Sequence, residues 1–258
     1  MINRNTFVVL SAVLFLGDAA FVDTLTQCGL KDTQCQKKLF QTVLKERSKT
    51  GIPEYNIPIF DPITLKDVNL PVLDIANLTL VEGKIKGLSS CVLNDFSTYV
   101  DSGRATMDLT CDITVSGNYK AFASSPLIKA TLGGDSIRGD GKVKIKIEKL
   151  NLKFDFKFTV NKRDGETYLK GKNGKLVYKY EVLGKVVFAA NNLFMGDQDV
   201  SATITSMLNQ NWRLIMQTIG GQVMNRAMDR VKDLISNLFD HIPTKYFISD
   251  DLSAYVTN

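Results

Sequence analysis

Residues 198–240 read QDVSATITSMLNQNWRLIMQTIGGQVMNRAMDRVKDLISNLFD, and the spacing of their apolar residues decides the fold. Apolar side chains recur at every third or fourth position from Val200 to Phe239, which is the period of an α-helix. The pattern predicts one long helix, about 60 Å in length at 1.5 Å per residue. A compact ball of this chain length would be only about 45 Å across. We therefore expect an elongated molecule in which other elements cover the helix.

Strands are the expected cover. The longest alternation of apolar and polar residues spans 142–160, and its phase slips by one position after Lys149. A slip that preserves the apolar face indicates a β-bulge, which bends a strand. Shorter alternating runs around 78–85, 107–115 and 176–182 extend the pattern. These runs predict an α+β fold, in which a long, highly curved antiparallel sheet wraps the C-terminal helix as a super-roll.

Two other features refine this expectation. Residues 36–48 have the composition of a helix, and the proline-rich stretch 52–63 predicts an extended, irregular crossing. Gly220–Gly221 interrupts the helical propensity of the long helix midway. This pair predicts either a kink in the helix or the close approach of a strand.

The first residues are typical of a secretory signal. Met1–Asn5 contain a basic residue, Thr6–Leu16 are apolar, and small residues follow near position 19. The apolar stretch is shorter than the about 20 residues that span a bilayer, although an uncleaved anchor is the alternative. We expect a signal peptide at residues 1–19 and a single ligand-binding domain at 20–258, secreted into the extracellular fluid as a monomer.

Four cysteines in a secreted chain are expected to form two disulfides. Cys28 and Cys35 flank a short loop. Cys91 and Cys111 lie in two strand-like runs joined by a turn near residue 101, so an antiparallel hairpin places them opposite one another, within disulfide range. The spacing therefore favours Cys28–Cys35 and Cys91–Cys111 over the other pairings, and no CxxC pair supports a zinc site.

The charge pattern leaves two interpretations open. The formal net charge is +5, and residues 142–185 alone hold 13 Lys and Arg against 5 Asp and Glu. The first interpretation is the solvated outer face of a sheet, on which lysines discourage edge pairing. The second is a face that docks on an anionic surface of lipid or glycan, or on a receptor. A secreted chain is not expected to meet nucleic acid.

The sequence argues against an enzyme. A Ser-His-Asp or Cys-His site would need the single histidine, His241, which we expect to act as a solvent-exposed residue or helix C-cap. Gly134 and Gly139 have the spacing of a phosphate-binding loop, but Asp140 stands where that loop needs a lysine. No metal or other cofactor is expected. The sequon Asn77-Leu78-Thr79 marks Asn77 as the one candidate for N-glycosylation.

The chain resembles the insect takeout and juvenile hormone binding protein family over nearly its whole mature length. The resemblance rests on the Cys28–Cys35 spacing, on GIPEYNIPIFDP at 51–62, and on four shorter segments. These are KIKGLS at 84–89, LFMGD at 193–197, LNQNW at 208–212 and FDHIP at 239–243. The resemblance implies a fold in which a curved sheet surrounds a long C-terminal helix, with an apolar tunnel between them. It also implies that the protein carries juvenile hormone or another lipophilic molecule.

Two departures favour a takeout-like carrier over a specific hormone carrier. The second cysteine pair of the hormone carriers joins later strands to the helix region, unlike Cys91 and Cys111. The segment in which those carriers place a pocket tyrosine aligns with Val143–Ile147, which contains none.

The expected tunnel lies between one side of the long strands and one stripe of the helix. Met and Phe side chains that face one another make adaptable lipid pockets, although they are more often ordinary core. The alternative functions are a lipid-transfer type of protein, which docks on anionic membranes through the basic face of residues 142–185, and a packed structural protein without ligand. The predicted ligand-binding residues are Ile145, Ile147, Leu152, Phe154, Phe156, Tyr178, Met207, Leu208, Trp212, Ile215, Met216 and Ile219.

Overall fold

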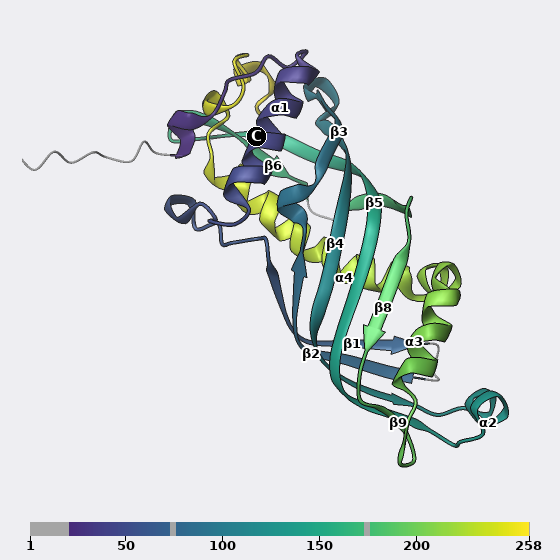
Figure 1. The fold of residues 1–258 in the computed structure, drawn as a ribbon. Coiled ribbons are helices and arrows are strands. Elements are labelled where there is room, and N and C mark those ends of the chain that lie inside the picture. Colours follow the sequence, from purple (N-terminus) through teal and green to yellow (C-terminus); the bar gives the residue numbers. More distant parts are fainter. Residues whose placement is uncertain (1–20, 73–75, 173–175, 258) are drawn as a thin grey trace, which may run out of the picture.

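The computed structural model describes residues 21–72, 76–172 and 176–257. The predicted signal peptide and the turn at residues 173–174 lie outside this part of the chain. The molecule is elongated, with α1 and the C-terminus at one end and α2 at the other (Figure 1).

The α-helices are α1 (Thr33–Arg47), α2 (Pro126–Leu132), α3 (Ser201–Gln210) and α4 (Trp212–His241). The 3-10 turns are η1 (Phe21–Thr24), η2 (Pro53–Tyr55), η3 (Leu88–Ser90), η4 (Val100–Ser102), η5 (Thr244–Tyr246) and η6 (Ser253–Tyr255).

Ten strands among the described residues form one curved antiparallel sheet, and α4 crosses behind it (Figure 1). The path of pairing runs β1-β2-β4-β5-β9-β10, while β3 pairs with β4, and β6, β7 and β8 pair with β5. The strands are β1 (Ile63–Val72), β2 (Ala76–Lys86), β3 (Val92–Tyr99), β4 (Arg104–Ala123), β5 (Ile137–Arg163), β6 (Glu166–Gly171), β7 (Val177–Val182), β8 (Val186–Ala190), β9 (Leu193–Met195) and β10 (Gln198–Asp199).

The predicted long strand is the spine of this sheet, and its bulge is confirmed. β5 has 27 residues and pairs with β4 over most of its length. The pairing register shifts where Cys111 opposes Leu150 but Ile113 opposes Ile147. Lys149 adopts a positive φ of 51°, and its backbone N–H donates to Asp112 Oδ1 at 2.8 Å. This side-chain hydrogen bond replaces the ladder bond that the bulge removes.

The prediction of one continuous helix over 198–240 is wrong, because the chain forms two helices in that region. The first residues of the range belong to β10, and the helices meet at Asn211, which leaves helical geometry with φ −110° and ψ 22°. The Asn211 side chain donates to the Met207 carbonyl at 2.9 Å, and so competes with the backbone for a helical acceptor. Asn209 also holds α3 to β8, since its side-chain amide exchanges hydrogen bonds with the backbone N–H and C=O of Phe188.

Two separate hydrophobic cores stabilise the two ends of the roll. The main core brings together α1, β3, the first half of β4, the second half of β5, and the second half of α4, in which Met224 and Met228 are buried. A smaller core at the α2 end contains Tyr119, Ile137, Leu193 and Val200. The sequence pattern predicted neither α2 nor a second core.

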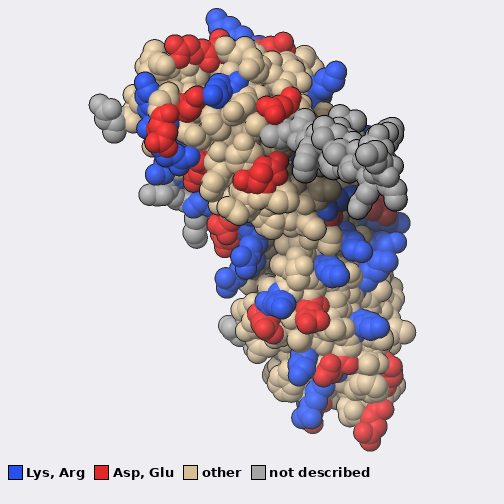
Figure 2. Space-filling view, turned by 90° about the vertical axis from the view of Figure 1, so that its left-hand side faces the viewer, with Lys and Arg blue, Asp and Glu red and all other residues tan. Residues whose placement is uncertain are grey.

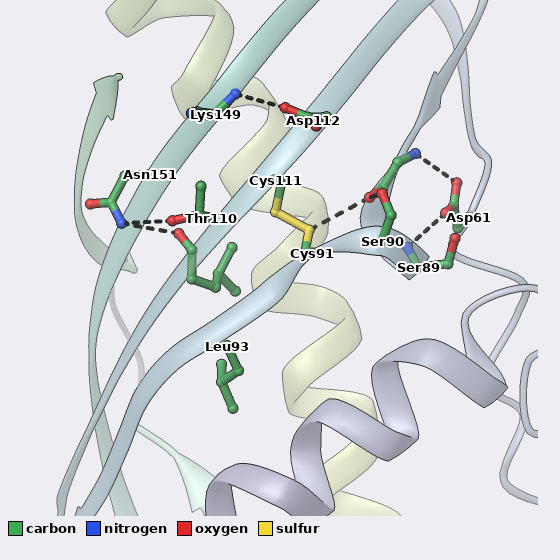
Figure 3. The surroundings of a disulfide bond; sticks show 12 residues. Asp61, Ser89, Ser90, Cys91, Leu93, Thr110, Cys111, Asp112, Lys149 and Asn151 are labelled. Atoms are coloured by element: carbon green, nitrogen blue, oxygen red, sulfur yellow. Dashed lines mark hydrogen bonds between the residues drawn. A yellow bond between two sulfur atoms is a disulfide. The ribbon is translucent and has the colours of Figure 1, made fainter. Parts of the chain in front are cut away.

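Both predicted disulfides are present, and they lie at the end with the main core. Cys28 and Cys35 are bonded beside the start of α1. Cys91 and Cys111 join the β3–β4 hairpin, whose register places them opposite one another (Figure 3). Among the described residues, no helix is long and apolar enough to cross a membrane.

The segment 51–62 and the segment 84–89, which both belong to the family resemblance, are joined by a buried carboxylate. Asp61, only 7% exposed, accepts backbone hydrogen bonds from Gly87 at 3.1 Å and from Ser89 at 2.7 Å (Figure 3). Burial alone would raise the pKa of Asp61, but these hydrogen bonds outweigh it, so the pKa lies below its ordinary value. The ionised carboxylate therefore anchors the irregular crossing to the sheet.

Candidate functional site

The candidate ligand site is the stretch of apolar interior that lies between the two cores. α3 has no buried side chain, and α4 has none before Gly220. The half-buried side chains of Leu208, Ile215 and Ile219 belong to neither core. Half-buried apolar side chains in the middle of the molecule are less closely covered than core side chains, so they are the candidates to contact an apolar ligand.

The first strand contributes a second row of such side chains. Leu65, Val68 and Leu70 of β1 are half-buried and also belong to neither core. They lie on the inward face of the sheet, as the pairing of β1 with β2 indicates. Ile63 is opposite Ile85, which packs against the main core, and Leu70 is opposite Leu78, which packs against the second core. α4 contacts β1 and β8. The helices and β1 therefore supply the two apolar rows of the candidate site.

The twelve predicted ligand-binding residues divide into two groups. Eight lie in or against the main core, and of these Ile147, Leu152 and Phe154 are buried. The other five of that group are half-buried against it: Ile145, Phe156, Tyr178, Trp212 and Met216. The four that lie outside the core are Leu208, Ile215 and Ile219, which are half-buried, and Met207, which is 42% exposed. The structure thus separates side chains that pack in or against the main core from side chains that belong to neither core.

Two tyrosines of β7 hold α4 over the sheet. Tyr178 Oη donates to Asn225 Oδ1 at 2.9 Å, and Tyr180 Oη donates to the Met216 carbonyl at 3.2 Å. Burial raises the pKa of both hydroxyls, so both stay protonated and remain donors at neutral pH. The sequence analysis predicted Tyr178 as a ligand contact, but it did not identify Tyr180 as a residue that holds α4 to the sheet.

Gly220 allows the close approach of β7 to α4, which is one of the two predicted consequences of the glycine pair. A Cβ at position 220 would lie 2.7 Å from Tyr180 Oη, whereas a Cβ at Gly221 would meet nothing within 4 Å. α4 continues through both glycines. The two adjacent positions therefore have opposite tolerance for a side chain.

This difference predicts opposite effects of alanine at the two positions. Gly221→Ala should raise the free energy of unfolding by up to about 1 kcal/mol, because alanine favours the helix. Gly220→Ala gains the same propensity but displaces the Tyr180 hydroxyl and its hydrogen bond, at a cost of about 1 kcal/mol or more. Urea denaturation measures both. In a Tyr180→Phe background, which lacks the obstructing oxygen, the two alanine variants should become similar; a persistent difference would contradict the explanation.

Two open hollows lie elsewhere on the surface, and neither includes a predicted ligand-binding residue. One, of about 570 Å³, lies against the middle of the sheet and is lined by residues 116–118, 142–144 and 189–191. The other, of about 410 Å³, lies between the residues that follow η1 and α1, and includes Phe21, Leu25, Leu39 and Val43. The case for the candidate site therefore rests on the half-buried rows and not on these hollows.

The predicted glycosylation site is placed where a glycan can be accommodated. Asn77 is exposed on β2, and its cross-strand partner on β4 is Phe122, whose side chain is 47% exposed. Directly opposed side chains share a face of the sheet at about 4.5–5.5 Å between Cβ atoms. A sugar on Asn77 would therefore cover an aromatic ring that is otherwise left in water.

We expect protein secreted from eukaryotic cells to carry a glycan at Asn77. Treatment with peptide N-glycosidase should lower the mass of the native protein by the mass of the glycan. The Thr79→Ala variant should show no such decrease, because the sequon requires a hydroxyl residue at that position. Thr79→Ser is the matched control, since it keeps the sequon, and should retain that mass. An intact mass equal to the bare polypeptide in the native protein would show that the site is not used.

The candidate site includes residues that the sequence analysis did not select. The alternation of Leu65, Val68 and Leu70 is obscured by an irregularity at Asp67, which adopts a positive φ of 49°. The partial alternation of apolar and polar residues on either side of Asp67 could have identified these three residues from the sequence. Asn209 gave no such signal, because its partner on β8 is set only by tertiary structure.

Comparisons with known proteins agree on one family. The family profile described as haemolymph juvenile hormone binding protein matches residues 6–249. The crystal structure of Epiphyas postvittana Takeout 1 is similar, with a TM-score of 0.76 and 25% identity, covering 87% of this chain and 99% of that chain. A lipopolysaccharide binding protein matches with a TM-score of 0.39 and 11% identity, over 82% of this chain and 38% of its own, too weak a similarity to support an argument. No curated protein sequence matched.

Proposed function

Because this chain belongs to the haemolymph juvenile hormone binding protein family, we propose that it is a secreted carrier of a small hydrophobic ligand. Residues 1–19 act as the signal peptide of this carrier, and residues 20–258 form its single domain. The ligand is a juvenile hormone-like terpenoid, a fatty acid or another lipid. The role is binding and not catalysis.

The observation that carries the proposal is the stretch of half-buried apolar side chains between the two cores. Leu208, Ile215 and Ile219 belong to it from the helices, and Leu65, Val68 and Leu70 belong to it from β1. An apolar ligand that replaces water against these side chains gains about 25 cal/mol for each Å² of apolar surface that it buries, before the cost of association. Selection in such a site depends on the length and bulk of the ligand.

Trp212 provides the readout, since it is the single tryptophan of the chain and the first residue of α4. Its ring is half-buried beside the apolar row and lies 4.5 Å from the guanidinium of Arg213. Titration with retinol or a fluorescent fatty acid should change the Trp212 emission in a saturable way. Native mass spectrometry of the purified protein should detect a bound lipid of matching mass.

A filling substitution tests the position of the site. Ile219→Phe should reduce the affinity for retinol or fatty acid by about tenfold or more, equivalent to about 1.4 kcal/mol, because the larger ring occupies the ligand's space. Leu214→Phe is the matched control on the same helix, since Leu214 is 60% exposed. The proposal fails if neither probe binds the native protein. Equal affinities of both variants and the native protein would place the ligand elsewhere.

A further inference from the structure

Six lysines occupy three neighbouring cross-strand rows on the outward face of the sheet. The rows are Lys86–Thr114–Lys146, Lys84–Ser116–Lys144 and Lys66–Glu82–Asn118–Lys142. All six lysines are exposed, and residues in register share one face. We call these six residues the lysine face. Figure 2 shows Lys and Arg side chains gathered around the middle of the molecule.

The lysines of the lysine face are not held in ion pairs within the described part of the chain. None of its six ammonium groups forms an ion pair or hydrogen bond with another residue in the described part of the chain. Glu82 is the one acidic residue in the three rows. Other lysines do pair with acids, such as Lys153 with Asp108 and Lys185 with Glu148. Because like charges on neighbouring strands repel, folding alone does not favour this arrangement.

The lysines form a regular grid. Alternate residues along a strand are about 6.6–6.8 Å apart, which separates Lys142, Lys144 and Lys146 evenly on β5. Lys84 and Lys86 stand two strands away, at about 9.5 Å. Short polar side chains, Thr114, Ser116 and Asn118, lie between the two lines of lysine and offer hydrogen-bond donors. A ligand with anionic groups repeated along its length would meet a cation at each step.

We propose that the lysine face binds a linear sulfated polysaccharide that runs along β5. Such a polyanion carries its sulfates in a row, and its association releases condensed counterions by the same physics as nucleic-acid binding. The sulfates pair with the ammonium groups as charge-assisted hydrogen bonds. A carrier held in this way stays close to sulfated extracellular surfaces.

An anionic membrane fits this face less well. Peripheral proteins usually add apolar insertion to electrostatic attraction. No large, exposed apolar side chain lies in the three rows; such side chains lie elsewhere, for example Phe122, Leu183 and Phe194. The sheet also curves around α4, so the lysine face is not flat as a bilayer is (Figure 1). A flexible chain can follow that curvature.

The polysaccharide and the apolar ligand would use opposite faces of the same strand. Lys144 and Lys146 point outward, whereas their neighbours Val143 and Ile145 pack inward. Neither binding event needs the other. The lysine-face proposal therefore does not rest on the proposed carrier function, and its failure would leave that function untouched.

Two triple variants of the full secreted protein test the proposal. Lys84→Gln/Lys144→Gln/Lys146→Gln removes three charges from the lysine face. Lys153→Gln/Lys185→Gln/Lys245→Gln removes three charges from lysines that already pair with acids, and so matches it in net charge. Affinity for a heparin octasaccharide is measured by calorimetry at several salt concentrations. Circular dichroism and urea denaturation show whether each variant is folded.

We expect the lysine-face variant to lose affinity by about fivefold per lysine, on the order of a hundredfold in total, with a shallower salt dependence. The control variant should lose less than about fivefold, because paired surface lysines contribute little to an external surface. Desulfated heparin should not bind. Equal losses in the two variants, or no binding of the octasaccharide, would overturn the proposal. It would also be overturned if vesicles of equal parts phosphatidylcholine and phosphatidylserine bound as tightly and with the same dependence on these lysines.

Discussion

Phe154→Ala is expected to lower the free energy of unfolding by about 3–5 kcal/mol, the usual cost of removing a buried aromatic ring. Phe154 is 4% exposed in the main core, and its ring stacks on Phe156 with centroids 5.6 Å apart. Neighbouring side chains are held by the sheet and by α4, so they cannot collapse fully into the space. The remaining cavity adds its own cost to the loss of apolar burial.

Ile219→Ala provides the contrast, because Ile219 is also apolar but is half-buried and belongs to neither core. Its removal should cost clearly less, under about 2 kcal/mol in the ligand-free protein, since fewer contacts are lost. The preference among probes should instead move toward longer or bulkier fatty acids, which refill the lost contact area. Denaturant unfolding and competition binding measure the two effects.

The two variants together distinguish core from site. If Ile219→Ala destabilises as strongly as Phe154→Ala and leaves ligand preference unchanged, the interior between the cores is ordinary packing. Phe156→Ala and Met216→Ala should fall between the two in stability, because both side chains are half-buried against the main core.

Asp61→Ala is expected to destabilise the protein by about 3 kcal/mol or more. The carboxylate accepts two backbone hydrogen bonds, from Gly87 and Ser89, and bonds to a charged group contribute about 1.5–3 kcal/mol each. Alanine would leave both N–H groups without this acceptor. Asp61→Asn keeps one carbonyl oxygen and should cost about half as much. A loss no larger than that of an exposed aspartate such as Asp95→Ala would contradict the anchoring role.

The same carboxylate should make stability depend on pH in a defined direction. Because the pKa of Asp61 is lower in the folded protein than its ordinary value of 3.8, ionised Asp61 stabilises the fold above that value. This stabilisation is lost as the pH falls through the folded pKa. The difference in unfolding free energy between native protein and Asp61→Asn should therefore shrink below about pH 4. A difference that stays constant down to pH 2 would exclude titration of Asp61 as its source.

Local sequence patterns sufficed for the parts of the fold that depend on neighbours along the chain. The phase slip after Lys149 predicted the bulge, because side chains of a strand alternate strictly between faces. The turn near residue 101 predicted the Cys91–Cys111 pairing, because a hairpin register follows from its turn. Gly220–Gly221 predicted either a kink or the close approach of a strand; the structure has the close approach, by Tyr180, which the sequence did not identify.

The division of the predicted helix shows where such patterns fail. The spacing from Leu208 to Trp212 stays in helical step, so periodicity does not distinguish one helix from two that meet at Asn211. The break depends on Asn211 competing for the Met207 carbonyl and on Asn209 holding α3 to β8. The first effect is local but leaves no mark on the apolar period, and the second requires a partner on β8 that only the folded chain brings into reach.

The sequence by itself determined the class of fold and the disulfide pairing, because these follow from periodicity and turn chemistry, and the resemblance of its motifs indicated the family. It also marked the apolar residues that face inward. Only the tertiary structure decided that Phe154 is buried in the main core while Ile219 is half-buried outside both cores, and that six lysines share one face of the sheet with Glu82 as the one acidic residue in their rows. The physical reason is that packing and charge compensation depend on which surfaces meet across the sheet, and residues far apart in the chain supply those surfaces.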